Sequence, residues 1–229
     1  MIVKICGTTN EDDALLSVAL GADLIGFIFA PSPRQIAPQV AADIVKRLPP
    51  EIVAVGVFRD EAPKRVVDIA LRSGMRAVQL HGHETPEETR WIRERVPLVI
   101  KVFAAGDPKV ARALDYGADI VMLDGPRPGS GEGWDRSYAG EVPPGPRLMI
   151  AGGLDATNVA GVIARTRCWG VDAASGVEKA PGVKDPVRLR AFIAAAKAAA
   201  PDGGDGGDGA DGARGDWPAG GVYDWEDDA

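Results

Sequence analysis

Two residues, Cys6 and Asp124, end apolar, strand-like stretches of the sequence. One could accept a proton and the other could donate one. A buried cysteine is more often a small apolar residue than a base, but Gly7 opens space beside this thiol. A carboxylate that ends a buried strand is costly unless it is paired or lies in a cleft, and desolvation favours its protonated form. We therefore expect Cys6 to act as a base and Asp124 as an acid. An aspartate that only caps a helix or loop is the structural alternative.

Lys4 lies two residues before Cys6, so both side chains are expected on the same face of one strand. Its ammonium group could stabilise the thiolate form of Cys6. It could also form an ion pair in the interior with Asp172 of the last expected strand. The two roles are compatible.

Two turns of small residues indicate a phosphate site. Gly152 and Gly153 follow one expected strand, and Ser175 and Gly176 follow the next. Such turns leave backbone N–H groups exposed, and barrel enzymes bind phosphate there with help from a helix N-terminus. Glycines that serve only the tight turns are the alternative.

Arg34 and His81 are the other candidate binding residues. Two prolines precede Arg34 and stiffen its loop, which would preposition the guanidinium for a carboxylate or phosphate. A solvated surface arginine is the alternative. His81 and His83 share one loop and are too few for a metal site, so we expect no metal, and His81 is expected to line the pocket.

These residues must be positioned by an alternation of strands and helices. Short β-branched runs alternate with longer segments whose apolar residues lie three and four apart. The expected strands are Ile2–Cys6, Leu24–Phe29, Ile52–Phe58, Arg76–Leu80, Leu98–Phe103, Asp119–Asp124, Arg147–Ala151 and Gly170–Ala174. The expected helices include Glu11–Leu20, Val40–Leu48, Pro63–Arg72, Pro86–Arg95, Pro108–Tyr116 and Asn158–Arg165.

Strands that are apolar on both faces predict a parallel sheet covered by helices. Eight such units favour an α/β fold of the closed (β/α)8 TIM barrel type, whose active sites lie at the C-terminal ends of the strands. A doubly wound α/β sheet is the alternative, but the glycine-rich loop that usually follows its first strand is absent.

Composition divides the chain of 229 residues at Ala200. Residues 1–200 suit one catalytic barrel and carry a net charge of +1, whereas residues 201–229 carry −8 and include a Gly/Asp repeat with nothing to bury. We expect that tail to be disordered. Its aromatic end, Trp217–Trp225, is either part of a solubilising appendage or a short motif that docks on this barrel or on an unknown partner.

The balance of charge in the barrel gives no reason to expect nucleic-acid binding. The sequence contains no run of 18 apolar residues, so no membrane span is expected. No signal peptide is recognised, and the two cysteines are far apart. We expect a cytoplasmic, reduced protein.

Over residues 1–200 the sequence resembles the phosphoribosylanthranilate isomerase family. It departs from the family pattern in two places: Gly129–Gly133 replaces the usual Gly-Gly-Thr-Gly loop, and Ala174 stands where a second serine is common. The segments that carry the resemblance are Lys4–Gly7, Gly26–Arg34, Val55–Phe58, Val78–Gly82, Leu123–Gly125, Gly129–Gly131, Ala151–Leu154 and Asp172–Glu178.

The resemblance implies an isomerase of tryptophan biosynthesis that converts phosphoribosylanthranilate to the 1-deoxyribulose product in an Amadori rearrangement. It implies Cys6 as the base, Asp124 as the acid, Arg34 as the ligand of the anthranilate carboxylate, and the two glycine turns as the phosphate site. The partner is then a small phosphosugar, and no cofactor is required.

Three other functions remain as alternatives. The first is another phosphosugar isomerase or epimerase on the same fold, but a metal-dependent epimerase needs histidines from separate strands. The second is an isomerase that also serves histidine biosynthesis, which would be expected to use paired aspartates rather than Cys6. The third is a binding scaffold without activity, which would have lost catalytic residues.

We predict that removal of residues 201–229 leaves the fold and the implied activity intact, because every candidate site residue precedes Ala200. The melting temperature and kcat/KM of the truncated and full-length chains would be compared. A drop in Tm of more than about 5 °C, or a loss of activity of about tenfold or more, would show that the tail belongs to the working protein.

Overall fold

The computed structural model describes residues 1–125 and 134–200. The candidate loop Gly129–Gly133 and the tail 201–229 lie outside the described residues, so the expectations about them remain predictions.

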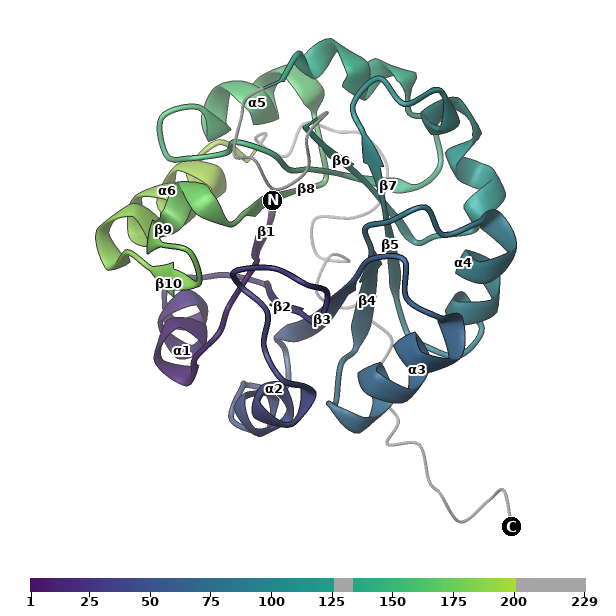
Figure 1. The fold of residues 1–229 in the computed structure, drawn as a ribbon. Coiled ribbons are helices and arrows are strands. Elements are labelled where there is room, and N and C mark those ends of the chain that lie inside the picture. Colours follow the sequence, from purple (N-terminus) through teal and green to yellow (C-terminus); the bar gives the residue numbers. More distant parts are fainter. Residues whose placement is uncertain (126–133, 201–229) are drawn as a thin grey trace.

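Eight parallel strands close into a barrel, which confirms the expected fold class (Figure 1). The strands pair in chain order, and β1 pairs with β8 to complete the ring. Each strand begins or ends within one or two residues of the range expected from sequence. They are β1 (Ile2–Ile5), β2 (Leu24–Ile28), β3 (Val53–Phe58), β4 (Ala77–Leu80), β5 (Val99–Ala104), β6 (Ile120–Asp124), β7 (Arg147–Ile150) and β8 (Gly170–Ala173).

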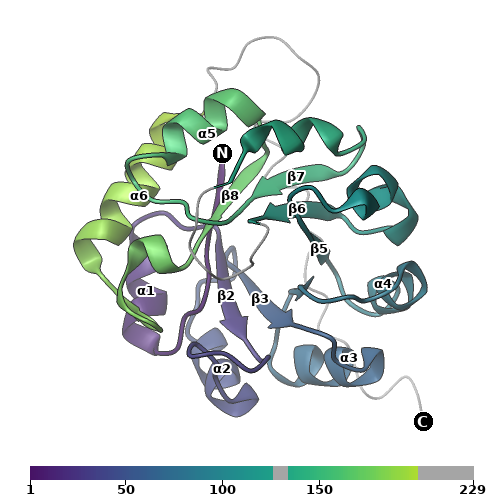
Figure 2. The same ribbon diagram turned by 45° about the horizontal axis from the view of Figure 1, so that its top comes forward.

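Helices surround the barrel, as the view in Figure 2 shows. Proline opens several of them, and its missing N–H costs nothing in the first turn. The α-helices are α1 (Glu11–Ala19), α2 (Pro38–Val45), α3 (Pro63–Arg72), α4 (Pro86–Arg93), α5 (Val159–Thr166) and α6 (Pro186–Ala198).

Several elements differ from, or add to, the sequence expectation. Pro108–Tyr116 forms a 3-10 helix, η1, rather than an α-helix, and it is kinked at Arg112, whose backbone lies outside the helical region. Two short 3-10 helices, η2 (Arg136–Glu141) and η3 (Ser175–Val177), follow β6 and β8. Strands β9 (Glu178–Ala180) and β10 (Val183–Lys184) form a small antiparallel hairpin before α6.

Side chains alternate between the two sides of each strand, and this alternation separates two apolar clusters. One cluster lies between strands and helices and includes Val3, Ile5 and Phe27. The other fills the barrel interior and includes Leu24, Ile100 and Met122. Every second residue of a strand therefore faces the interior.

The same alternation carries polar side chains to one end of the interior. Lys4, Gln79, Asp124 and Asp172 occupy interior-facing positions late in their strands, and all four are buried or nearly so. Buried polar groups must find partners or a cavity. No helix in the described ranges is long and apolar enough to cross a membrane.

Candidate active site

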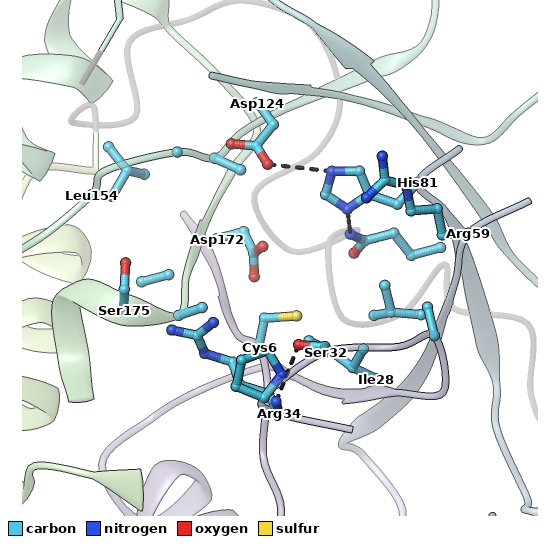
Figure 3. Close-up of a pocket in the computed structure, with 18 of the residues that line it drawn as sticks. Cys6, Ile28, Ser32, Arg34, Arg59, His81, Asp124, Leu154, Asp172 and Ser175 are labelled. Atoms are coloured by element: carbon cyan, nitrogen blue, oxygen red, sulfur yellow. Dashed lines mark hydrogen bonds and ion pairs between the residues drawn. The ribbon is translucent and has the colours of Figure 1, made fainter. Parts of the chain in front are cut away.

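A cavity of about 300 Å³ opens at the C-terminal ends of the strands, where a barrel enzyme carries its active site. In Figure 3, Cys6 and Asp124 lie on opposite sides of this cavity, with Asp172 between them. Strands β2, β3, β4, β6 and β8 contribute to its wall, together with Cys6 after β1 and the segments after β2, β7 and β8. The candidate residues that line it are Cys6, Arg34, His81, Asp124, Gly152, Gly153 and Ser175.

Cys6 directly follows β1 and lies beside a buried ion pair. Lys4 Nζ donates a hydrogen bond to Asp172 Oδ1 at 2.9 Å, which confirms the pairing expected from sequence. Gly26 of β2 makes room for this arrangement: a Cβ there would lie 2.9 Å from Cys6 Sγ and 3.1 Å from Lys4 Nζ. The thiol and the ammonium group therefore share the space that a side chain at Gly26 would occupy.

Burial and the neighbouring charges change the pKa of the Cys6 thiol in opposite directions. Burial raises the pKa of Cys6 above its ordinary value, the positive charge of Lys4 acts to lower that pKa, and the negative charge of Asp172 raises it again. Burial alone would lower the pKa of Lys4, but the charges of Asp172 and Cys6 outweigh it and raise that pKa. Lys4 therefore remains charged and is the group that favours a thiolate at Cys6.

Asp124, the last residue of β6, has a close neighbour at each carboxylate oxygen. Oδ1 accepts a hydrogen bond of 2.7 Å from the backbone N–H of Gly125. Oδ2 lies 3.3 Å from His81 Nε2. Gly152 must be a glycine here, because its φ is +82° and a Cβ would lie 2.5 Å from Asp124 Oδ1. The turn after β7 thus packs directly on the carboxylate.

Arg34 is positioned by a buried carboxylate, Glu178. Its Nε donates to both carboxylate oxygens at 2.9 and 3.0 Å, and its Nη2 donates to Oε2 at 2.7 Å. Lys184 Nζ completes the cluster with a 3.0 Å contact to Glu178 and a 2.5 Å hydrogen bond to the Cys6 carbonyl. Burial alone would raise the pKa of Glu178, but hydrogen bonds from Arg34 and Lys184 hold it below the ordinary value.

One edge of the Arg34 guanidinium is therefore fixed, and the side chain crosses Gly7, whose φ is +72°. Among the described residues, Nη1 has no hydrogen-bond partner, and Arg34 lines the cavity. A guanidinium held by one edge can still present its other N–H groups to an anion.

The two small-residue turns meet at the cavity, but their members play different parts. Gly152, Gly153 and Ser175 line it, whereas Gly176 does not. A Cβ at Gly176 would lie 2.0 Å from the Leu154 carbonyl oxygen, so this glycine allows one turn to pack against the other. The expectation that Gly176 also binds ligand through its backbone N–H stays a prediction.

Arg136 of η2 supports the turn after β7. It donates to the carbonyls of Ala151 and Gly152 at 3.0 and 2.7 Å. Burial lowers the pKa of Arg136 to about 10, which leaves it charged at neutral pH. Within 1–125 and 134–200 there is no group of three or more His, Cys, Asp or Glu side chains placed to hold a metal ion.

The sequence patterns do not identify the residues that hold the candidate site side chains in place. Glu178 and Gln79 lie within segments that carry the family resemblance, but neither was given a role. Lys184 was not considered at all. The available signal was a charged or amide residue within an otherwise apolar stretch, which in a buried strand demands a partner. The partners themselves are remote in sequence, and only the fold brings them together.

The charges around Cys6 predict opposite effects for two substitutions. Asp172→Asn removes a charge that raises the pKa of the thiol, so the pH midpoint of alkylation should fall. Lys4→Met removes a charge that lowers this pKa, so the midpoint should rise, by about 1–3 pH units if an ordinary close charge pair is lost. Iodoacetamide labelling in a Cys168→Ser background isolates Cys6, because the chain has two cysteines. Shifts of the same sign in both variants would contradict this account.

Comparison with known proteins adds an independent observation. Residues 3–195 match the family model described as N-(5'-phosphoribosyl)anthranilate isomerase. A protein of that name from Desulforudis audaxviator is 43% identical over 205 residues, which cover 86% of this chain and 98% of the relative.

Two solved structures agree with the fold and the family. Phosphoribosyl anthranilate isomerase from Thermus thermophilus has a TM-score of 0.80 and 44% identity, with 86% of this chain and 99% of that one covered. A second such isomerase was solved in complex with reduced 1-(o-carboxyphenylamino)-1-deoxyribulose 5-phosphate; it has a TM-score of 0.76 and 40% identity and covers 86% of this chain and 100% of its own. This chain therefore belongs to the N-(5'-phosphoribosyl)anthranilate isomerase family.

Proposed function

We propose that this cavity catalyses the isomerisation of N-(5'-phosphoribosyl)anthranilate to 1-(2-carboxyphenylamino)-1-deoxyribulose 5-phosphate, with Asp124 as the acid and Cys6 as the base. The observation that carries the proposal is the placement of these two groups on opposite sides of one cavity. The same cavity contains a prepositioned arginine and a double-glycine turn, which are suited to the two anionic ends of the substrate.

The first step opens the ribose ring. The carboxyl group of Asp124 gives its proton to the ring oxygen, and the anilinic nitrogen supplies the electron pair that breaks the bond between C1' and that oxygen. The products of this step are a protonated Schiff base and the Asp124 carboxylate. The N–H of Gly125, which donates to Oδ1, stabilises the negative charge that develops on Asp124.

The second step moves a proton from carbon. The Cys6 thiolate takes the proton at C2', and the electron pair of the C–H bond moves toward the Schiff base to give an enolamine. Tautomerisation of the enolamine then gives the 2-ketone product. Lys4 favours the thiolate needed for this step, and the apolar surroundings of Cys6 keep that thiolate poorly solvated and basic.

The two ends of the substrate are bound by different groups. Arg34 is proposed to bind the anthranilate carboxylate, because its guanidinium faces the cavity while Glu178 fixes its other edge. Gly152, Gly153, Ser175 and Gly176 are proposed to bind the phosphate through backbone N–H groups and the serine hydroxyl. His81 lines the cavity beside Asp124. The compound bound in the solved relative carries the same two anionic groups.

The reaction as written needs no redox, nucleotide or metal group, since the acid and base are both side chains. We further propose that the protein works in a reducing cytoplasm, which fits the two unpaired, buried cysteines. Neither nucleic acid nor a membrane has a part in this proposal.

Cys6→Ser and Asp124→Asn should each lower kcat by about 10²- to 10⁴-fold, the usual contribution of a general base or acid. Both replacements are close in size, so the fold should be kept, which circular dichroism and Tm can verify. Turnover is followed as the loss of phosphoribosylanthranilate fluorescence. Cys168→Ser and the exposed Asp43→Asn are matched controls that should retain full activity. A variant of Cys6 or Asp124 with near-normal turnover would remove that residue from the mechanism.

Arg34→Ala should raise KM by about 10- to 100-fold, since a charge-assisted hydrogen bond contributes roughly 1.5–3 kcal/mol. The effect on kcat should be smaller, because the anthranilate carboxylate does not react. Arg72→Ala, at an exposed position of α3, provides the matched control. An unchanged KM in Arg34→Ala would rule out the assignment of Arg34 to the carboxylate.

A further inference from the structure

Gln79, His81 and Asp124 form a line of polar groups on the wall of the cavity. Gln79 Nε2 lies 3.2 Å from His81 Nδ1, and His81 Nε2 lies 3.3 Å from Asp124 Oδ2. Both contacts are drawn as dashed lines in Figure 3. Gln79 is 1% exposed and comes from the interior-facing side of β4, and the His81 side chain is 22% exposed at the end of the same strand.

Two atoms of this line have no aligned hydrogen-bond partner among the described residues. They are the buried Gln79 Oε1 and the buried His81 Nε2. A buried amide oxygen or ring nitrogen without a hydrogen-bond partner is costly. In this arrangement the Gln79 side-chain oxygen can accept a hydrogen bond but has no donor among the described residues.

The protonation of Asp124 decides the direction of hydrogen bonding in this line. When Asp124 is a carboxylate, Oδ2 can only accept, so the proton of neutral His81 must be on Nε2 and Gln79 Nε2–H donates to Nδ1. When Asp124 is protonated on Oδ2, that oxygen donates to Nε2. The proton of His81 is then on Nδ1, and it is accepted by Gln79 Oε1 after the amide turns over.

We propose that Gln79 and His81 form a reversible hydrogen-bond chain that accommodates both protonation states of Asp124. This proposal rests on the proposed function, in which Asp124 alternates between acid and carboxylate in every turnover. Glutamine fits the end of the chain because its amide both donates and accepts, so either direction leaves the buried groups paired. Gln79 and His81 are positioning residues, since they act through Asp124.

Other charges surround the chain and must be considered. Arg59, which follows β3, lines the cavity together with His81. Glu84 and Lys101 form a buried ion pair of 2.6 Å behind the loop that carries His81, and Arg136 acts on Asp124 from η2. These charges remain in place when His81 changes its tautomer, because the ring stays neutral in both arrangements.

The tautomer of His81 provides a direct test that needs no turnover. Imidazole ¹⁵N NMR of the labelled full-length chain distinguishes the protonated from the bare ring nitrogen. The chain has two histidines, and a His83→Gln variant assigns the spectrum; His83 is 78% exposed and is the matched control for His81.

We expect the proton of His81 on Nε2 in the wild-type protein. Asp124→Asn should move it to Nδ1, because the introduced amide would keep its oxygen on the Gly125 N–H and turn its NH₂ group toward Nε2. The same tautomer in wild type and Asp124→Asn would overturn the proposal.

Kinetics separate this proposal from the assignment of Asp124. His81→Gln keeps an amide N–H at the place of Nε2, whereas His81→Asn places it near Nδ1, away from Asp124. We expect His81→Asn to lower kcat by about 10- to 100-fold with KM changed less than about threefold, and His81→Gln to restore most of the loss. The alkaline limb of the kcat profile should move in His81→Asn and not in His83→Gln.

Failure of the proposed function and failure of the hydrogen-bond chain would give different results. Full activity of Asp124→Asn would remove the acid role itself and with it the proposed function. An inactive Asp124→Asn together with equal kcat and pH profiles for His81→Asn and the wild type would leave the acid role intact and overturn only the hydrogen-bond chain.

Discussion

The ion pair between Lys4 and Asp172 joins the first and last strands of the barrel at the level where the apolar interior gives way to the cavity. Below it, interior positions hold Leu24, Ile100 and Met122, which pack without polar partners. A charge placed in that layer would have no compensation, whereas this pair compensates itself and faces a cavity on one side. The pair therefore forms the floor of the site.

The same pair sets the environment of Cys6. Gly26 of the adjacent strand β2 has no side chain, and this leaves the space that the Cys6 thiol and the Lys4 ammonium group occupy. On the opposite side of the cavity, Asp124 is held by a backbone N–H and a histidine rather than by a cation side chain bonded to it. A base beside the positive charge of Lys4 and an acid without a bonded cation among the described residues suit opposite proton tasks in one cavity.

A second buried cluster links the binding residues to the last part of the barrel. Glu178 of the β9–β10 hairpin accepts hydrogen bonds from Arg34 and Lys184, and Lys184 also donates to the carbonyl of Cys6. One carboxylate thus orients the proposed ligand of the substrate carboxylate and supports the end of β1. The hairpin has no counterpart in the preceding seven βα units of the described chain, and its place beside the site accounts for its presence.

The sequence by itself determined the fold class, the strands to within about two residues, and seven of the residues that line the cavity. This was possible because these features depend on local patterns: apolar runs on both faces of a strand, prolines at helix starts, and reactive residues at strand ends. The Lys4–Asp172 pair was also accessible, since both residues lie at interior-facing positions of strands that must meet when the barrel closes.

Tertiary structure alone decided how those residues are held. Nothing local in Glu178 or Lys184 relates them to Arg34, which lies more than a hundred residues earlier and meets them only when the ring is closed. The packing of Gly176 against the Leu154 carbonyl is also visible only in the fold, because the sequence of a glycine turn does not show which neighbour its missing side chain admits. The 3-10 geometry of η1 likewise depends on how Pro108–Tyr116 fits between β5 and β6, since its apolar spacing suits either helix.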